Sequence, residues 1–228
     1  MTVTATADVE TTRDNPAARV LWRTGAASLI AGPLLFFAGN VTAPVQDSET
    51  QAGYVESLAR DPMLTQVSAL LLHYGNIFIG VGALLLPLLV RGRKGAIVTI
   101  VGSLMMALGF LNISGNLLSD WWIMELGRNL PVEQAVALAE GALGHGLLQV
   151  WNFTEMLSLL GVVVAQVGLA RAGVIGWWAV PVPAICLLGA FALPLSMPVL
   201  ISAVVGAAFA PLVVAGVRGL RRPAQRLG

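Results

Sequence analysis

The sequence predicts an all-α protein, a polytopic bundle of six transmembrane helices with both termini in the cytoplasm and short interfacial helices in the two outer loops. Composition is the first reason, because 57% of the 228 residues are apolar and only 11% are charged, against roughly 25% charged in soluble domains. The mean hydropathy of +0.81 agrees with this. The second reason is a set of apolar runs of membrane-spanning length, and the third is where the basic residues lie.

Six apolar segments each approach or exceed the roughly 20 residues that a helix needs to cross a bilayer. They cover residues 25–43, 65–90, 95–118, 146–170, 174–193 and 199–217. The last two are cut from one apolar stretch, in which Pro194 and Pro198 supply the break because proline interrupts a helix. Residues 24–217 therefore form a single bundle, with a disordered polar tail at 1–23 and a basic tail at 218–228.

The basic residues decide the orientation of these spans. Most of them flank the same ends: Arg13, Arg19, Arg23, Arg91, Arg93, Lys94, Arg171, Arg218, Arg221, Arg222 and Arg226. Only Arg60 and Arg128 lie on the other side, where the acidic residues gather. The positive-inside rule then places both termini in the cytoplasm. We expect a multi-pass plasma-membrane protein whose basic C-terminal tail meets anionic lipid and not nucleic acid.

Both outer connections contain helix signals. In the first, Ser48 begins a capping-box pattern, and Asp61-Pro62 is typical of the start of a helix. In the second, Pro131 opens a short amphipathic segment that ends near Gly144. We expect both segments to lie as interfacial helices over the bundle.

The chain carries an internal repeat at a spacing of 76 residues. Under this shift Asn40 matches Asn116 and Asn76 matches Asn152, among weaker apolar identities. A duplicated helical hairpin would explain the matches, and chance identity between apolar segments is the alternative. The two copies would be residues 25–90 and 101–166.

Strongly polar side chains gather in the outer halves of the first four spans, whereas the inner halves are Leu, Val, Ala and Gly. A polar group facing lipid is costly, so these side chains should turn toward one another or toward water. We therefore expect a cavity between the four spans that opens at the outer leaflet. Its candidate substrate-binding residues are His73, Asn76, Asn112, Asn116, Trp121, Trp122, Gln149, Trp151 and Asn152.

These residues also have a purely structural interpretation. The asparagines would join neighbouring helices through hydrogen bonds worth about 1 kcal/mol each. His73 would bond a neighbouring Asn, and His145 would be solvated near the interface. Trp121 and Trp122 would anchor the third span at the membrane surface.

Glu155 is the residue that such structural roles explain least. It ends the stretch HGLLQVWNFTE, in which His145, Gln149, Asn152 and Glu155 share about a third of a helix circumference. No Lys or Arg within a span can neutralise it, so the carboxyl group is either protonated or hydrogen-bonded to His73, Gln149 or an asparagine. An ionisable residue at this depth is a functional hypothesis, and a protonated carboxyl suits a general acid or a proton carrier.

Asp120 is the second candidate catalytic residue. It lies with Trp121 and Trp122 at the outer end of the third span, where a carboxyl group can simply end a helix at the water boundary. In the functional interpretation, Asp120 and one tryptophan cover the cavity, and the aromatic face stabilises a cation. Glu155 and Asp120 would then be the acid and base needed to protonate an epoxide or olefin and guide a carbocation.

In size and in the two acidic residues Glu155 and Asp120, the chain loosely resembles the small integral-membrane terpene cyclases of meroterpenoid and indole-sesquiterpenoid pathways. The resemblance covers the general architecture and no contiguous motif, and the fungal members have seven spans. It implies a metal-independent cyclase or isomerase for an isoprenoid, with Glu155 and Asp120 as catalytic residues. The Ala-, Val- and Gly-rich composition is also similar to that of small multi-span proteins of high-GC bacteria, which implies no activity.

Two other classes stay open. A proton-coupled transporter or lipid-binding membrane protein would use Glu155 as its protonation site, in a homo-oligomer if one copy has too few spans for a pathway. A haem protein would use His73 and His145 as axial ligands.

Several kinds of chemistry lack their motifs. The sequence has no P-loop, dinucleotide-binding glycine motif, zinc-protease motif or Asp-rich magnesium motif. Its single cysteine, Cys186, excludes an intramolecular disulfide and a cysteine metal site. We therefore expect no metal and no cofactor, and a hydrophobic small molecule as substrate.

Overall fold

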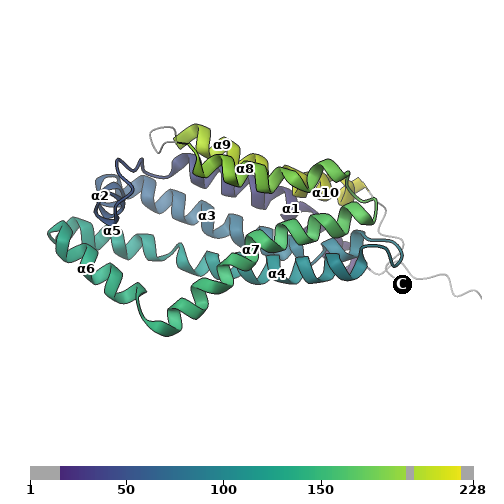
Figure 1. Ribbon diagram of the computed structural model, residues 1–228, viewed down its shortest axis with the longest axis horizontal. Helices are drawn as coiled ribbons and strands as arrows, with labels where there is room; N and C mark the ends of the chain where they lie inside the picture. Colours follow the sequence, from purple (N-terminus) through teal and green to yellow (C-terminus); the bar gives the residue numbers. More distant parts are fainter. Residues whose placement is uncertain (1–15, 194–197, 222–228) are drawn as a thin grey trace, which may run out of the picture.

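The computed structural model describes residues 16–193 and 198–221, and over these ranges its regular elements are all helices (Figure 1). Long helices lie side by side along one axis, and shorter helices cover one end of them. The α-helices are α1 (Pro16–Thr42), α2 (Gln51–Arg60), α3 (Pro62–Ala83), α4 (Ala96–Asn116), α5 (Ser119–Asn129), α6 (Val132–Leu143), α7 (Gly146–Arg171), α8 (Pro181–Phe191), α9 (Pro198–Ala208) and α10 (Ala210–Arg221). Two short 3₁₀ helices are η1 (Leu86–Leu89) and η2 (Trp177–Ala179).

Four of the six predicted spans are long helices. The helices α1, α3 and α7 are long and apolar enough to cross a membrane, and so is α4 together with α5. These helices indicate a membrane protein. The first one begins at Pro16, within the segment that the sequence analysis assigned to a polar tail. Residues 1–15 lie outside the described residues.

The predicted fifth and sixth spans are short or bent. The helix α8 has 11 residues, well below the roughly 20 that a span needs. The helices α9 and α10 are bent by 49° at the break between them, so together they count as one span at most. Pro198 begins α9, whereas Pro194 lies outside the described residues. The described part of the chain therefore has four or five membrane-length helices, and the prediction of six is not confirmed.

Glycine sets the contact within each of two helix pairs, α1 with α3 and α4 with α7. A methyl group at Gly109 of α4 would lie 2.2 Å from the backbone nitrogen of Ser158 on α7. One at Gly32 of α1 would lie 2.7 Å from the backbone nitrogen of Ile79 on α3. Carbon atoms do not approach nitrogen this closely, so only glycine permits these backbone contacts. Glycines at or next to these contacts recur at every seventh residue, at Gly25, Gly32 and Gly39 on α1 and at Gly95, Gly102 and Gly109, of which Gly95 immediately precedes α4. Gly25 faces Leu85, just beyond the end of α3.

The two pairs use the same packing at a spacing that differs from the predicted repeat. Gly32 faces Ile79 in one pair, and Gly109 faces Ser158 in the other. Equivalent positions are therefore 77 residues apart on α1 and α4 but 79 apart on α3 and α7, so no single shift superposes both. A duplication at 76 residues stays a prediction.

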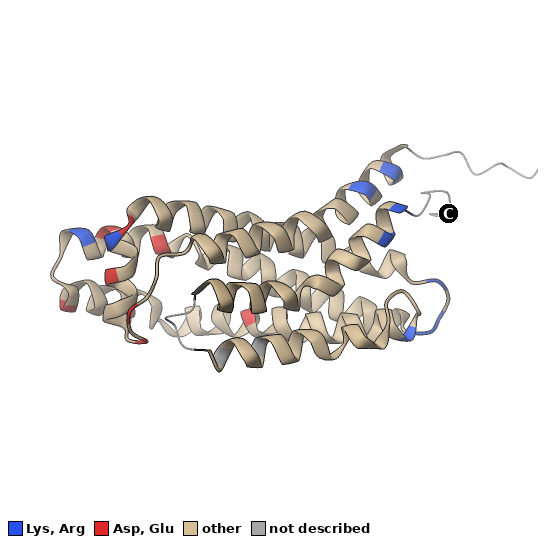
Figure 2. Cartoon of the chain, turned by 90° about the horizontal axis from the view of Figure 1, so that it is seen from above, with Lys and Arg blue, Asp and Glu red and all other residues tan. Residues whose placement is uncertain are grey.

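Charged side chains lie mostly at the two ends of the bundle, one positive and one negative (Figure 2). The basic end is formed by the start of α1, the α3–α4 connection, the end of α7 and the end of α10. The acidic end is formed by residues 43–61 and by α5 and α6, and carries most of the acidic residues. Between the ends, an apolar core around Ile79, Phe110, Val162 and Leu169 joins the long helices.

A cap layer of α2, α5 and α6 covers the acidic end. Its helices share a small core of Val55, Leu58, Ile123, Met124, Ala135 and Ala139. The layer contains both segments that the sequence predicted as loop helices, and also α5, which was not predicted.

The sequence signals for the starts of α2 and α3 are confirmed in part. Asp61 accepts a hydrogen bond of 3.0 Å from the backbone of Leu64 and so caps α3, which confirms that signal. The capping prediction for α2 at Ser48 is wrong. Thr50 caps that helix by accepting a hydrogen bond of 3.1 Å from the backbone of Gly53, and the Ser48 hydroxyl instead contacts the Thr50 hydroxyl at 2.8 Å.

Candidate functional site

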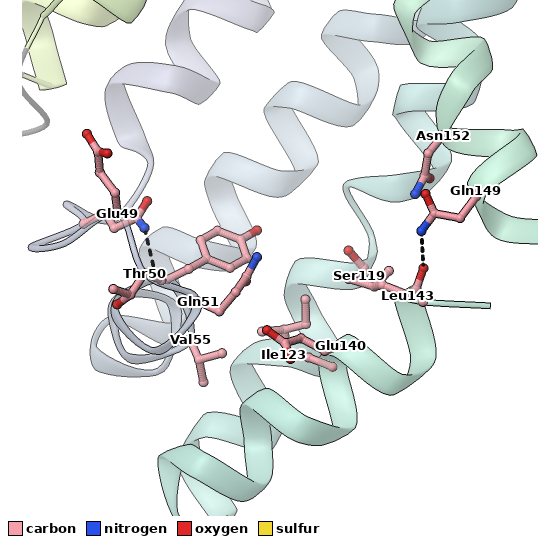
Figure 3. Close-up of a pocket in the computed structure, with 14 residues that line it drawn as sticks. Glu49, Thr50, Gln51, Val55, Ser119, Ile123, Glu140, Leu143, Gln149 and Asn152 are labelled. Carbon is pink, nitrogen blue, oxygen red and sulfur yellow. Dashed lines mark hydrogen bonds between the residues drawn. The ribbon is translucent and has the colours of Figure 1, made fainter. Parts of the chain in front are cut away.

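The cap layer and the start of α7 surround an open cavity of about 520 Å³ at the acidic end. Figure 3 shows Glu49, Thr50 and Gln51 on one side of it, and Gln149 and Asn152 on the other. The lining residues are Gln46, Glu49, Thr50, Gln51, Tyr54, Val55, Ser119, Ile123, Ala139, Glu140, Leu143, Gly144, Gln149 and Asn152. The walls thus combine amide, hydroxyl and carboxyl groups with an apolar patch from the cap-layer core.

Tyr54 joins this cavity to Asp120. The phenol of Tyr54, on α2, lines the cavity and donates a hydrogen bond to the Asp120 carboxylate in the first turn of α5. Burial, and after it the charge of Asp120, raises the pKa of the Tyr54 phenol well above its ordinary value of 10.0. The phenol therefore keeps its proton, and Asp120 lies directly behind it.

Glu155 is held by an asparagine on the facing helix. The Asn116 amide, at the end of α4, donates hydrogen bonds to the Glu155 carboxyl group and, at 3.2 Å, to the Asn152 carbonyl oxygen. Asn152 lines the cavity, whereas Glu155 does not. Glu155 is therefore set back from the cavity and joined to it by the hydrogen bonds through Asn116 to Asn152. It lies on the same face of α7 as Asn152. This arrangement matches one of the two predicted alternatives, in which Glu155 is either protonated or hydrogen-bonded to His73, Gln149 or an asparagine.

Asn116 also relates the two carboxyl groups. It precedes Asp120 by four residues, about one helical turn, near the junction of α4 and α5. A chain of contacts thus runs from Glu155 through Asn116 to the turn that carries Asp120, and from Asp120 to Tyr54. The two predicted catalytic residues are thus connected to the wall of the same cavity, Asp120 directly to Tyr54 and Glu155 through Asn116 to Asn152.

A second set of contacts joins α4 to α7 beside this one. The Asn112 amide donates to the Thr154 hydroxyl, and Thr154 donates to the backbone oxygen of Trp151 at 2.6 Å. The indole of Trp151 donates to the backbone oxygen of Asn112 at 3.4 Å. Neither Asn112 nor Trp151 lines the cavity. These two residues therefore make hydrogen bonds between α4 and α7.

His73 and Asn76 lie on α3 and face the bundle. The Nδ1 atom of His73 is 2.8 Å from both the hydroxyl and the backbone oxygen of Ser114 on α4. The Asn76 side chain is fully buried, and its amide nitrogen donates to the backbone oxygen of Leu72 at 2.7 Å while its oxygen has no hydrogen-bond partner. Neither residue reaches the cavity.

Three further candidates are exposed. Trp121 and Trp122 on α5 are each 38% exposed and do not line the cavity. Gln149 lines it and donates to the backbone oxygen of Leu143 at 3.4 Å. The cavity thus contains Gln149 and Asn152 from the predicted set. It lies under the cap layer, whereas the sequence analysis expected it between the first four spans.

Most of the cavity wall was not anticipated from the sequence. Tyr54, Glu49, Gln51, Ser119 and Glu140 were not among the candidates, because polar residues in connecting segments carry no periodic signal that places them beside a distant helix. Tyr54 alone offered a hint, as an aromatic residue in a short amphipathic segment. Its contact with Asp120 joins positions 66 residues apart and is set by the tertiary fold.

The two histidines occupy different environments. His73 is partly buried between α3 and α4, whereas His145 is exposed at the start of α7. Among the described residues, no group of three or more His, Cys, Asp or Glu side chains is arranged to hold a metal ion.

Comparisons with protein-family models, with curated proteins and with solved structures give no match for this chain.

Proposed function

We propose that this chain is an integral membrane enzyme that acts on a lipid-soluble substrate by carboxyl acid/base chemistry. One observation supports the proposal above the others. Two carboxyl groups are connected by hydrogen bonds to the wall of one cavity. Asp120 contacts the lining residue Tyr54 directly, and Glu155 is joined to the lining residue Asn152 through Asn116. Partly buried, hydrogen-bonded acidic residues near a cavity are an arrangement that suits acid/base catalysis.

The two groups suit different steps. Protonated Glu155 would add its proton to an olefin or an epoxide of the substrate, which forms a carbocation. The reaction would end when the cation loses a neighbouring proton to the Tyr54 oxygen while Tyr54 passes its own proton to Asp120. Asp120 then releases its proton to water and Glu155 takes one up from water, so both groups return to their starting states and the net reaction rearranges the substrate without consuming an acid. Glu155 does not line the cavity. For its proton to reach the substrate, the Asn152 amide must turn aside, or a water molecule must carry the proton between them.

An isoprenoid is the substrate class to test first. Carbocation rearrangement without a metal is the chemistry that the resemblance to membrane terpene cyclases implies, with Glu155 and Asp120 in the catalytic roles. The cavity supports a substrate with one polar end, because its polar wall lies beside the apolar side chains of Val55, Ile123 and Leu143.

We also propose that the bundle crosses the plasma membrane several times with its basic end in the cytoplasm. The separation of charge between the two ends supports this orientation. The Trp22 indole near the start of α1 donates a hydrogen bond of 2.9 Å to Gly219 near the end of α10, so both ends of the described chain meet at the basic end. The cap helices α2 and α6 would then lie at the outer interface. In a protein of six spans, α8 and α9 would each have to cross the membrane together with their flanking segments, as the two arms of one hairpin.

A solvent-deuterium experiment tests the enzyme proposal. The protein in lipid nanodiscs is incubated in D₂O with acyclic isoprenoid alcohols, and products are analysed by mass spectrometry after their hydroxyl groups have exchanged back in H₂O. Protonation of an olefin at carbon adds one deuterium that does not exchange, so a cyclised or isomerised product gains one mass unit. Glu155→Gln should abolish this product, because an amide carries no transferable proton at neutral pH.

The matched control is Glu133→Gln, an exposed acidic residue of α6 outside the cavity. It should leave product formation unchanged. Full turnover by a folded Glu155→Gln variant would refute the role of this carboxyl group.

A lipid-binding protein without turnover is the second candidate. The positions of Glu155 and Asp120 favour this alternative, because neither of these two carboxyl groups lines the cavity. Proton-coupled transport is less well supported, since the described core between Glu155 and the basic end is filled by apolar side chains such as Met106, Val162 and Leu169. A haem site would need His73 and His145 to approach one another, and one is bonded to Ser114 while the other is exposed at the start of α7.

A further inference from the structure

The cavity walls point to the chemistry of the ligand's polar end. We propose that the cavity binds the head group of an amphiphile that is uncharged and carries hydroxyl groups, while the apolar part of the ligand lies along α7 toward lipid. The inference rests on the proposed function and narrows its substrate class. It excludes phosphate and diphosphate head groups.

Charge is the first argument. None of the 14 lining residues is Lys, Arg or His, and two of them, Glu49 and Glu140, are carboxylates. The two arginines at this end are already paired outside the cavity. Arg60 contacts Asp47 at 2.7 Å, and Arg128 contacts Glu125 at 3.1 Å. A phosphate would therefore meet negative charge and no cationic partner.

The polar groups of the wall are the second argument. Four lining side chains are amides, which both donate and accept hydrogen bonds, and three carry hydroxyl groups. These residues are Gln46, Gln51, Gln149 and Asn152, with Thr50, Tyr54 and Ser119. A ligand hydroxyl likewise donates and accepts, so it can pair with either kind of group. An ammonium group only donates, so it can pair with the amide oxygens of the wall but not with the amide N–H groups.

Exposed apolar side chains of α7 lie on the same helix face as a residue of the cavity wall. Val55, Ile123, Ala139 and Leu143 form the apolar part of the lining. On α7, Phe153 and Met156 follow the lining residue Gln149 by four and seven residues, which places them on its face of the helix. They are 69% and 61% exposed. In the proposed membrane orientation these side chains face lipid, so a tail that leaves the cavity here passes from one apolar surface to another.

Binding of three short amphiphiles with the same tail tests the proposal. Octyl glucoside, octyl phosphate and octylammonium are titrated below their micellar concentrations into protein in phosphatidylcholine nanodiscs, with empty nanodiscs as the reference. The protein is prepared without glycoside detergents, which would occupy the site. We expect octyl glucoside to bind about tenfold more tightly than either charged amphiphile, because each charged head group leaves polar groups unpaired.

Variants locate the binding and its selectivity. Gln51→Trp narrows the cavity at an exposed wall residue and should weaken glucoside binding severalfold. The double variant Glu49→Gln and Glu140→Gln removes the wall charge and should bring octyl phosphate closer to octyl glucoside in affinity. Glu133→Gln lies outside the cavity and should change neither ratio.

The outcomes separate this proposal from the enzyme proposal. Equal or tighter binding of octyl phosphate, tighter binding of octylammonium, or glucoside binding that Gln51→Trp leaves intact would overturn the head-group assignment. Glu155→Gln should retain glucoside binding, because Glu155 is not part of the wall. Selective binding without any deuterated product would overturn the enzyme proposal alone and leave a lipid-binding protein.

Discussion

Tyr54 donates a hydrogen bond to Asp120, and this contact joins the cap helix α2 to the first turn of α5, just after the α4–α5 junction. The two residues are 66 positions apart in the sequence. The contact places a phenol on the cavity wall with a carboxylate behind it. It thus links the packing of the cap layer to the chemistry that the cavity can support.

Removing the phenol oxygen should loosen the cap. Tyr54→Phe leaves the Asp120 carboxylate without its phenol donor, so we expect a loss of about 1–3 kcal/mol in the free energy of unfolding. Hydrogen exchange of the α2 backbone should rise with it. Asp47→Asn, which breaks the exposed contact to Arg60, is the matched control and should have an effect below about 1 kcal/mol. Equal losses of unfolding free energy in Tyr54→Phe and Asp47→Asn would show that the Tyr54–Asp120 hydrogen bond stabilises the protein no more than an exposed ion pair does.

The ionisation of Tyr54 gives a pH prediction. Its pKa is raised above 10.0, so the folded protein holds the neutral phenol more strongly than the unfolded chain does. That contribution to stability is complete below pH 10 and declines as the pH rises above it, because only the unfolded chain then ionises. The free energy of unfolding should therefore fall more steeply above pH 10 in the wild type than in Tyr54→Phe.

Ultraviolet absorbance checks the same point directly. The protein has two tyrosines, so subtracting the titration of Tyr54→Phe from that of the wild type isolates Tyr54. No phenolate signal should appear in this difference at pH 10. A normal titration there would contradict the buried hydrogen bond.

The glycine contacts predict a strong positional effect. Gly109→Ala would place a methyl group 2.2 Å from the backbone nitrogen of Ser158, so α4 and α7 must separate, at a cost of about 1–3 kcal/mol. Gly141→Ala, in α6, meets no atom within 4 Å and should be neutral or slightly stabilising. Reaction of Cys186, the single cysteine, with a thiol dye on heating measures both variants.

Gln166 predicts a stabilising substitution. Its side chain is 0% exposed, and neither amide atom has a hydrogen-bond partner. Gln166→Met keeps the volume and removes the unpaired groups, so the free energy of unfolding should rise by about 1–3 kcal/mol. Ser158→Ala is the comparison, because it removes a buried polar group that does have a hydrogen-bond partner. The Ser158 hydroxyl donates to the backbone oxygen of Glu155 at 2.6 Å. A drop in stability for Gln166→Met would show that the amide binds a partner such as internal water.

Several features of the candidate site were within reach of the sequence. Helical periodicity placed Gln149, Asn152 and Glu155 on one face of α7, and the lack of a cation in the spans predicted that Glu155 is either protonated or hydrogen-bonded. The structure supplies a hydrogen-bonding partner, Asn116. The predicted position of the cavity was different, because depth in a span says only how far along the bundle a residue lies. It does not say whether another helix stands in front of it.

The sequence by itself determined that the protein is helical and apolar, where its long helices lie and at which ends its charges gather. These properties follow from local composition and from the period of the α-helix, so no distant contact is needed to decide them. The tertiary structure alone decided that α2, α5 and α6 form one layer, that Tyr54 meets Asp120, and that α8 is too short to span by itself. Those outcomes depend on how segments far apart in the chain pack together, and glycine at the helix contacts sets how closely they do so.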